Sequence, residues 1–476
     1  MTGRILRTWA REAISGTTPP QSRCSSCCEA MMLDRTVRSS RTMAAAVSSQ
    51  LDSMASSSFG ALGFTIAIFG WGENIRGMIF AVDQSAVWIL SDCGISAKSG
   101  WPGEWAAMSE LWRAAGLVLG CLLIFCGSCQ PLAGQQRVQR ISFGSCAKQD
   151  QPQPIWDAIV AGAPDLFILL GDNIYGDTND MRVLREKYGM LERQPGFVKL
   201  RATCPVLATW DDHDYGRDDA GAEFEHRVES QRVFLDFVGA AAGDGRRQRE
   251  GVYWSAVYGP VGQRVQVILL DCRYFRSPLK KGFAVREPGE GYRGRYVPNE
   301  DSDATVLGEV QWAWLKQQLQ EPAELRVIGS SYQVLSNQHG WEMWGNFPRE
   351  RQRLFGLIRE TGAEGVLLIS GDRHLAELAA LPAGGTEGVG YPLFEATSSS
   401  LNAPSGNLTK LGVRFANEIN PYRAGLTWFD TNYGNILVDW SAADPVIRVQ
   451  ICDQTGAVVL QQRLLLSQLQ RGQSGR

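Results

Sequence analysis

Histidine is scarce in this chain, with only four copies among 476 residues, at positions 213, 226, 339 and 374. A metal site built mainly from histidines, such as a multicopper centre, is therefore excluded, and metal chemistry must rely on carboxylates, Cys or Tyr. An excess of one charge sign is also missing, because the formal net charge is -3. We therefore expect no nucleic-acid-binding surface, which would need a basic excess. The 11 Cys are too few for a disulfide scaffold in a chain this long.

Long hydrophobic runs are missing as well. The run from Ala114 to Phe125 is almost wholly apolar but spans only about a dozen residues, whereas a membrane-spanning helix needs about 20. The run follows the short segment Met108–Arg113, in which Arg113 is the one cation, and it precedes the small residues Ala133 and Gly134. This layout is typical of a secretory signal peptide. We therefore predict a signal segment at 108–134 and an exported, periplasmic or extracellular protein.

The context of Cys129 leaves two forms of export open. A small residue before a Cys, at the end of an apolar run, resembles a bacterial lipoprotein cleavage box. Acylation of Cys129 would tether the protein to a membrane face. Simple secretion with cleavage near Gly134 is the equal alternative, because both readings use the same apolar run.

The segment before Met108 shows no pattern of a folded domain. The apolar run 61–71 lacks a partner, and Cys24, Cys27 and Cys28 lack the further ligands that a structural zinc site needs. We interpret residues 1–107 as a non-native or disordered extension, with translation starting at Met108. A genuine N-terminal extension is the alternative.

After residue 137, strand-like and helical segments alternate. Apolar runs without polar alternation are typical of strands buried on both faces. Such strands are expected at 138–143, 165–170, 204–210, 265–270, 325–329 and 365–370, and helices at 155–160, 307–319 and 348–360. This is an α/β pattern. We predict one domain at 135–465, with the segment from Gln461 as an exposed helix end and residues 466–476 as a flexible tail.

Chemically active residues gather where these strands end. They are Cys146, Asp172, Asp212, His213, Asp372 and His374. In α/β sheets, ligand sites lie beyond the carboxyl ends of the strands. One Asp at a strand end usually caps the next helix, but several carboxylates at one sheet edge repel one another unless cations hold them. The pattern predicts a metal site.

The segment Gly171-Asp172-Asn173-Ile174-Tyr175 is the strongest single signal. A carboxylate directly at a strand end is placed to bridge two cations, and a Tyr three residues later reaches the same metal. A phenolate is a hard, anionic ligand that suits a ferric ion. Taken alone, Tyr175 is also compatible with a packed aromatic ring whose hydroxyl bonds to the backbone.

Three motifs together resemble the calcineurin-like metallophosphatase superfamily and, within it, the alkaline phosphatase D, or PhoD-like, family. They are the Gly-Asp-x-x-Tyr segment at 171–175, Asp211-Asp212-His213-Asp214, and Gly371-Asp372-Arg373-His374. Segments 143–146, 270–274, 308–315 and 341–348 also resemble family landmarks, so that the similarity covers about 138–460 in order. The resemblance implies a four-layer αββα sandwich with the metal site at the C-terminal ends of the strands.

The resemblance also implies roles for particular residues. The implied metal ligands are Cys146, Asp172, Tyr175, Asp212, Asp372 and His374, with Asp172 as the bridging carboxylate and His213 as the catalytic residue. Residues with possible substrate or supporting roles are Asn173, Asp214, Arg273 and His339. The chain departs from the superfamily pattern in lacking the first Asp-x-His pair and the middle ligand His, although His339 could lie near the site. Asp212 stands where most members have Asn.

The expected cofactors follow from the ligand set. Oxygen ligands favour Fe³⁺, Ca²⁺ or Mn²⁺, whereas Cys146 favours iron or zinc. The resemblance implies Fe³⁺ plus Ca²⁺, or another divalent cation such as Mn²⁺, Zn²⁺ or Mg²⁺. Such a site hydrolyses phosphate esters by an activated water, with His213 protonating the leaving oxygen. We predict a metallophosphoesterase; the sequence does not separate phosphomonoesters from phosphodiesters.

A second hypothesis is an exported binding module whose acidic loops hold structural calcium without catalysis. His213 beside Asp212, and Tyr175 close to Asp172, argue against it, because a passive calcium site needs neither. We expect a monomer whose partner is its phosphate-ester substrate. Three other cysteines, Cys204, Cys272 and Cys452, are interpreted as core residues, and His226 as a solvated helix residue.

Overall fold

The computed structural model describes residues 137–282, 294–406, 415 and 418–472, and the backbone of four strands between residues 64 and 98. The chain divides into two compact units, Met1–Ser128 and Cys129–Arg476. The predicted signal segment 108–134, with Cys129, lies outside the described residues. In the part of the chain that is described, no helix has the length and apolar composition needed to cross a membrane.

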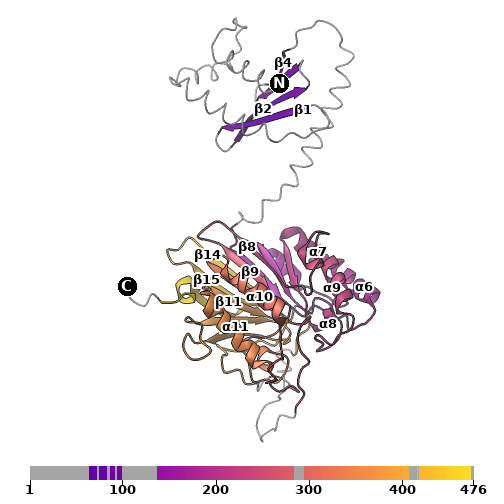
Figure 1. The fold of residues 1–476 in the computed structure, drawn as a ribbon, viewed down its shortest axis with the longest axis vertical. Coiled ribbons are helices and arrows are strands. Elements are labelled where there is room, and N and C mark those ends of the chain that lie inside the picture. The colour runs from indigo at the N-terminus through magenta and orange to yellow at the C-terminus, as the bar shows by residue number, and fades with distance from the viewer. Residues whose placement is uncertain are drawn as a thin grey trace. The chain divides into compact units, whose positions relative to one another are not determined.

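The N-terminal unit contains an antiparallel meander of four strands (Figure 1). These are β1 (Phe64–Trp71), β2 (Asn74–Val82), β3 (Ala86–Ser91) and β4 (Gly94–Lys98). The apolar run 61–71, for which the sequence offered no partner, thus contributes β1, and β2 pairs with it along its length. The interpretation of 1–107 as a segment without a folding pattern missed this sheet. The position of the translation start stays a prediction.

The C-terminal unit is built on two six-stranded sheets. The first sheet has the order β16-β15-β14-β5-β6-β7, and the second has the order β12-β13-β11-β10-β9-β8. The strands of the first sheet are β5 (Arg140–Gly144), β6 (Leu166–Leu170), β7 (Val206–Thr209), β14 (Asn432–Asp439), β15 (Val446–Asp453) and β16 (Val458–Leu465). Those of the second sheet are β8 (Trp254–Tyr258), β9 (Val265–Leu269), β10 (Leu325–Ser330), β11 (Val366–Ser370), β12 (Ala376–Leu381) and β13 (Leu393–Ser398).

Parallel strands occupy the middle of the second sheet and one half of the first. In the first sheet β5, β6 and β7 are parallel, and in the second β9, β10, β11 and β13 are parallel. The remaining pairs are antiparallel. The carboxyl ends of parallel neighbours share one edge of their sheet, so the turns after β5, β6 and β7 lie together.

Helices cover the outer faces of both sheets. They are α5 (Ile155–Ala161), α6 (Met181–Glu192), α7 (Pro195–Thr203), α8 (Asp212–Tyr215), α9 (Arg227–Phe237), α10 (Gly308–Gln320) and α11 (Pro348–Thr361). Figure 1 shows α10 and α11 grouped on one side of the unit and α6, α7 and α9 on another. The helices expected at 155–160, 307–319 and 348–360 correspond to α5, α10 and α11.

The alternation of side chains in β6 reveals the layers. Leu166, Ile168 and Leu170 pack in a core with the second sheet and with α10 and α11. Phe167 and Leu169 pack in a separate core with side chains of α5, α6, α7 and α9. Because successive side chains of a strand point to opposite faces, the first sheet lies between its own helices and the second sheet. The four-layer αββα sandwich predicted from the sequence is confirmed.

The end of the domain differs from the prediction. The segment from Gln461, expected as an exposed helix end, continues edge strand β16, which pairs antiparallel with β15. A short 3-10 turn at Leu466–Leu469 follows, and both of these leucines are buried. The peptide N–H of Gly365 donates to the carbonyl of Leu469 at 2.7 Å. The packed domain therefore reaches past the predicted boundary at residue 465.

The candidate metal centre

The predicted site residues lie just beyond the ends of parallel strands from both sheets. Cys146 follows β5, Asp172 to Tyr175 follow β6, and Asp372 and His374 follow β11. The triplet 212–214 opens the one-turn helix α8 directly after β7. The two sheets thus bring residues that are 199 positions apart in the sequence to one place: the Tyr175 hydroxyl lies 3.5 Å from Nε2 of His374.

Four of the predicted ligands have a backbone conformation that non-glycine residues seldom adopt. The φ angles are 59° at Cys146, 49° at Asp172, 68° at Asp372 and 55° at His374. Positive φ costs an ordinary residue of order 1 kcal/mol or more, and such residues persist only where the surrounding structure imposes them. Their concentration at these strand ends indicates that the turns are shaped to aim particular side chains.

Two glycines permit these turns to approach their neighbours. A Cβ on Gly171, which has a φ of 96°, would lie 2.4 Å from Cβ of Asp211. A Cβ on Gly371 would lie 2.5 Å from Oγ of Ser145, next to Cys146. Both distances are shorter than real carbon contacts, so the Gly in each Gly-Asp pair is required for the strand ends to meet.

One half of the site combines a thiol, a phenol, a carboxylate and an imidazole. Sγ of Cys146 lies 3.3 Å from Oδ2 of Asp172, and the Tyr175 hydroxyl lies 3.4 Å from the same oxygen. One ligand atom each of Cys146, Asp172 and His374 falls within 4.8 Å of the others. We call Cys146, Asp172, Tyr175 and His374 the thiol–phenol group.

His374 is prepared for ligation by its own contacts. Its Nδ1 faces the carbonyl oxygen of Ala403, which only accepts, so Nδ1 carries the proton and Nε2 presents a lone pair towards Tyr175. Its peptide N–H donates to Oγ of Ser399 at 2.7 Å. Burial lowers the pKa of His374 to about 4, so that the ring stays neutral at physiological pH.

The other half of the site is made of carboxylates and His213. One ligand atom each of Asp172, Asp212 and His213 lies within 4.8 Å of the others, and so does one of each of Asp212, Asp218 and Asp219. We call Asp172, Asp212, His213, Asp218 and Asp219 the carboxylate group. Burial alone would raise the pKa of Asp212, but the charges of His213 and Arg273 lower it below its usual range.

His213 is oriented by a residue that the sequence analysis did not single out. Its Nδ1 lies 2.7 Å from Oδ1 of Asp177, and its ring lies against that of Tyr175 with centroids 4.4 Å apart. The peptide N–H groups of Gly176 and Asp177 both bond to the carbonyl of His213, at 2.8 and 3.2 Å. Because a carboxylate only accepts, Nδ1–H points to Asp177 and Nε2 faces the site.

The side chain of Asp214 holds the neighbouring backbone in place through hydrogen bonds. Its carboxylate accepts hydrogen bonds from the peptide N–H groups of Asp172, Asn173 and Asp211, from the Asn173 side-chain amide and from the Tyr188 hydroxyl. All five contacts are donors and the side chain is buried, so Asp214 fixes the turns that carry the ligands and does not face substrate. Asn173 also donates to the Thr209 carbonyl at 2.9 Å.

Arg273 is likewise internal. It is fully buried, pairs with Asp211 at 2.5 Å and forms two hydrogen bonds to the Glu342 carboxylate, at 2.5 and 2.8 Å. Its charge therefore neutralises carboxylates beneath the site, and the structure does not place it for substrate contact. Neither Asp211 nor Glu342 was singled out from the sequence.

Asp372 and His339 lie further from the two groups. In the described part of the chain, Asp372 belongs to none of the three clusters of ligand atoms, although burial and the charges of Asp211 and Glu342 raise its pKa well above its usual range. His339 is buried, and its Nδ1 accepts the peptide N–H of Trp341 at 3.0 Å. Burial and the charge of Arg373 lower the pKa of His339 well below its usual value.

His226 lies half-buried at the start of α9, apart from both groups, and Cys204, Cys272 and Cys452 are buried free thiols.

The donor set fits a cation. Oδ1 of Asp172 is buried and has no hydrogen-bond partner among the described residues. Burial raises the pKa values of Cys146, Asp172 and Tyr175 well above their usual ranges, with carboxylate neighbours adding to the effect at each of them. Such acids stay protonated beside one another unless positive charge is supplied, and a bound cation reverses this preference.

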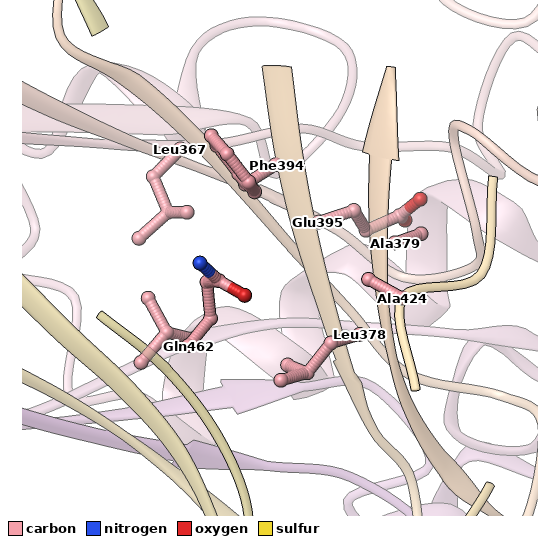
Figure 2. Close-up of a pocket in the computed structure, with 8 residues that line it drawn as sticks. Leu367, Leu378, Ala379, Phe394, Glu395, Ala424 and Gln462 are labelled. Carbon is pink, nitrogen blue, oxygen red and sulfur yellow. The ribbon is translucent and has the colours of Figure 1, made fainter. Parts of the chain in front are cut away.

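A small cavity elsewhere in the unit has no connection with these residues. It lies between the sheets, with Leu367 and Phe394 on one side and Gln462 of β16 on the other (Figure 2). Its lining contains none of the residues of the two groups. Apolar side chains dominate it, so that it is a packing gap between the layers.

Comparisons with known proteins show which family and fold the chain resembles. A family model described as PhoD-like phosphatase matches residues 141–444. A solved structure described as that of PhoD has a TM-score of 0.51 at 13% identity, with 84% of each chain covered. A dimetal phosphatase from Danio rerio has a TM-score of 0.42 at 11% identity, covering 70% of this chain and 100% of the other. No curated protein matches the chain.

The fold is that of a phosphatase of the αββα metallophosphatase class. The family model covers more than half of the chain, and the chain belongs to the PhoD-like phosphatase family. The structural match extends the resemblance in fold to residues outside the motifs.

Proposed function

We propose that the protein hydrolyses phosphate esters at a multinuclear metal site, with Asp172 shared between two cations. The observation that carries the proposal is that Asp172 belongs to both the thiol–phenol group and the carboxylate group. A carboxylate with two oxygens between two sets of ligands is arranged to bridge. When bound, the cations supply positive charge to the phosphoryl oxygens and acidify a water.

The protein's own residues position the ligand turns and supply the proton donor. Asp214 holds the turns after β6 and β7 in place, and Asp177 fixes the ring of His213. With its Nδ1–H directed to Asp177, His213 presents Nε2 towards the substrate side. There it donates a proton to the leaving oxygen or stabilises the charge that develops on it.

We further propose Fe³⁺ in the thiol–phenol group and Ca²⁺, or another divalent cation, in the carboxylate group. Sulfur and imidazole ligands favour iron over calcium, whereas the carboxylate oxygens of Asp212, Asp218 and Asp219 favour hard cations. A ferric ion held by a phenolate absorbs visible light through charge transfer. Tyr175→Phe removes only the phenolic oxygen, so an iron-containing preparation of this variant should lose or shift the band; an unchanged spectrum would remove Tyr175 from the site.

We also propose that the enzyme is exported and acts on phosphodiesters, phosphomonoesters or both. Support for export comes from the sequence at 108–134, with lipid attachment at Cys129 as one form of it.

The experiment that tests the function is hydrolysis of chromogenic mono- and diesters by purified protein, before and after chelation, with metal content measured in parallel. Activity should vanish as metal is removed and return on addition of Fe³⁺ and Ca²⁺. Full activity after verified metal loss would falsify the proposal.

A further inference from the structure

Lys148 carries an exposed cation beside the candidate metal centre, and no step described above uses it. Its Nζ lies 5.3 Å from the centroid of the Tyr175 ring. The hydroxyl of that ring is 3.4 Å from Asp172 and 3.5 Å from His374. The exposed ammonium group therefore lies next to the thiol–phenol group.

The backbone of Lys148 is held firmly at this position. Its peptide N–H donates to Oδ1 of Asn402 at 2.7 Å, and its carbonyl accepts from the side-chain amides of Asn402 and Gln153 at 2.9 and 3.0 Å. One residue earlier, the peptide N–H of Ala147 donates to the carbonyl of Asp172 at 2.8 Å. The base of the lysine side chain is thus fixed relative to the bridging carboxylate, and only its four-carbon stem is free to adjust.

Three other cations near the site pair with protein carboxylates. Arg273 pairs with Asp211 and Glu342, and Arg373 pairs with Glu418. The Nδ1 atom of His213 lies 2.7 Å from the carboxylate of Asp177. Lys148 forms no ion pair within the described residues.

We propose that Lys148 binds an anionic oxygen of the substrate and selects substrates by their charge. This inference rests on the proposed phosphoesterase function. A lysine ammonium is a compact point charge on a flexible stem, which suits contact with phosphate oxygens. The oxygen belongs either to the phosphoryl group that reacts or to a second acidic group next to it, and the two sources are distinguishable by kinetics.

The test compares Lys148→Met and Lys148→Arg with Lys199→Met in the holoenzyme. Lys199 is a matched control, since it is exposed and pairs with Asp157 on the outer helices. In Lys148→Met, KM should rise about 5- to 10-fold with little change in kcat, as expected for loss of uniform binding to a charged group. Lys148→Arg, which keeps the charge, should recover most of the affinity.

Two arms identify the oxygen. If Lys148 contacts the reacting phosphoryl group, inhibition by inorganic phosphate weakens in Lys148→Met by a similar factor. If it contacts a neighbouring acidic group, phosphate inhibition is unchanged and KM rises only for substrates with a second phosphate. Lys148→Met kinetics equal to those of Lys199→Met in both arms would overturn the inference. A wild type that hydrolyses no phosphate ester would instead refute the proposed function.

Discussion

The two halves of the candidate centre share Asp172 but differ in their chemistry and their exposure. The thiol–phenol group joins strands of both sheets, since Cys146 and Tyr175 follow the first sheet and His374 follows the second. The carboxylate group is carried mainly by α8 and the residues after it. There the Asp218 side chain is 63% exposed and that of His213 is 19% exposed.

This difference indicates a division of labour. A buried group that needs both sheets for its assembly is suited to hold one cation for the lifetime of the fold. A more open group, in which most of the ligand atoms are carboxylate oxygens, is suited to an exchangeable divalent cation and to substrate entry. Asp219, which is engaged by Arg295 and Tyr296, marks the outer limit of the open half.

Asp172→Ala should have the largest effect, because it removes a ligand from both halves at once. We expect loss of all bound metal and of measurable hydrolysis. Elemental analysis and the ester assay check this, with the exposed residue Asp157→Ala as control and circular dichroism to verify folding. A folded variant that retains either cation at wild-type content would show that the halves do not depend on Asp172.

His213→Ala tests whether the open half is catalytic as well as ligating. If His213 acts as a general acid, turnover should fall by about 10²–10⁴-fold while both metals remain. The loss should be greatest for substrates with poor leaving groups, which need the proton most. If His213→Ala loses metal to the same extent as Asp172→Ala, His213 is a ligand instead.

Asp177→Asn should have a smaller effect in the same half. The hydrogen bond to Nδ1 of His213 then involves a neutral amide, so the ring is held less firmly and its positive form is less favoured. We expect about a tenfold lower kcat, in keeping with the contribution of a hydrogen bond to a charged group, and unchanged metal content. Asp157→Asn serves as the matched control. Equal kcat values for the two variants would leave Asp177 without a role in catalysis.

The layers, and the place of the candidate ligands at the strand ends, could be predicted from the sequence because both leave local signals. Strands such as β6 and β11 are buried on both faces and appear as unbroken apolar runs, and the ligands follow them within a few residues. The motif at 171–175 placed Asp172 and Tyr175 in one turn, and the structure brings both side chains to the same centre.

What the sequence did not reveal depends on contacts between distant segments. Arg273 resembled an available cation after a strand, because nothing local shows that Glu342, 69 residues later, binds it. Asp177 resembled an ordinary turn residue, although a second Asp close behind the Gly-Asp pair was a signal that could have been weighed. In β16, the run Leu-Gln-Gln-Arg-Leu-Leu at 460–465 suits an edge strand as well as a helix, and only the pairing with β15 decides.

The smallest expected effect concerns the stability of the chelated protein, and its sign follows from the clustered acids. Burial raises the pKa values of Asp172 and Asp372 well above their usual range, while in the unfolded chain both titrate near 3.9. Above about pH 4 the folded, metal-free protein therefore holds protons that the unfolded chain releases. Its stability must fall as the pH rises.

The titration of His213 also lowers the stability of the chelated protein as the pH rises, and the titration of Asp212 does not counteract this fall. Although burial alone would lower the pKa of His213, the charges of Asp212 and Asp172 raise it, so its contribution is present at low pH and lost as the pH rises. The depressed pKa of Asp212 adds stability that is already complete above about pH 4.

The melting temperature of the chelated protein should thus be a few degrees lower at pH 8 than at pH 5. In the metal-loaded protein, cations replace these protons, and the trend should disappear or reverse. A chelated protein that melts at a higher temperature at pH 8 would mean that the acids are not clustered as the structure shows.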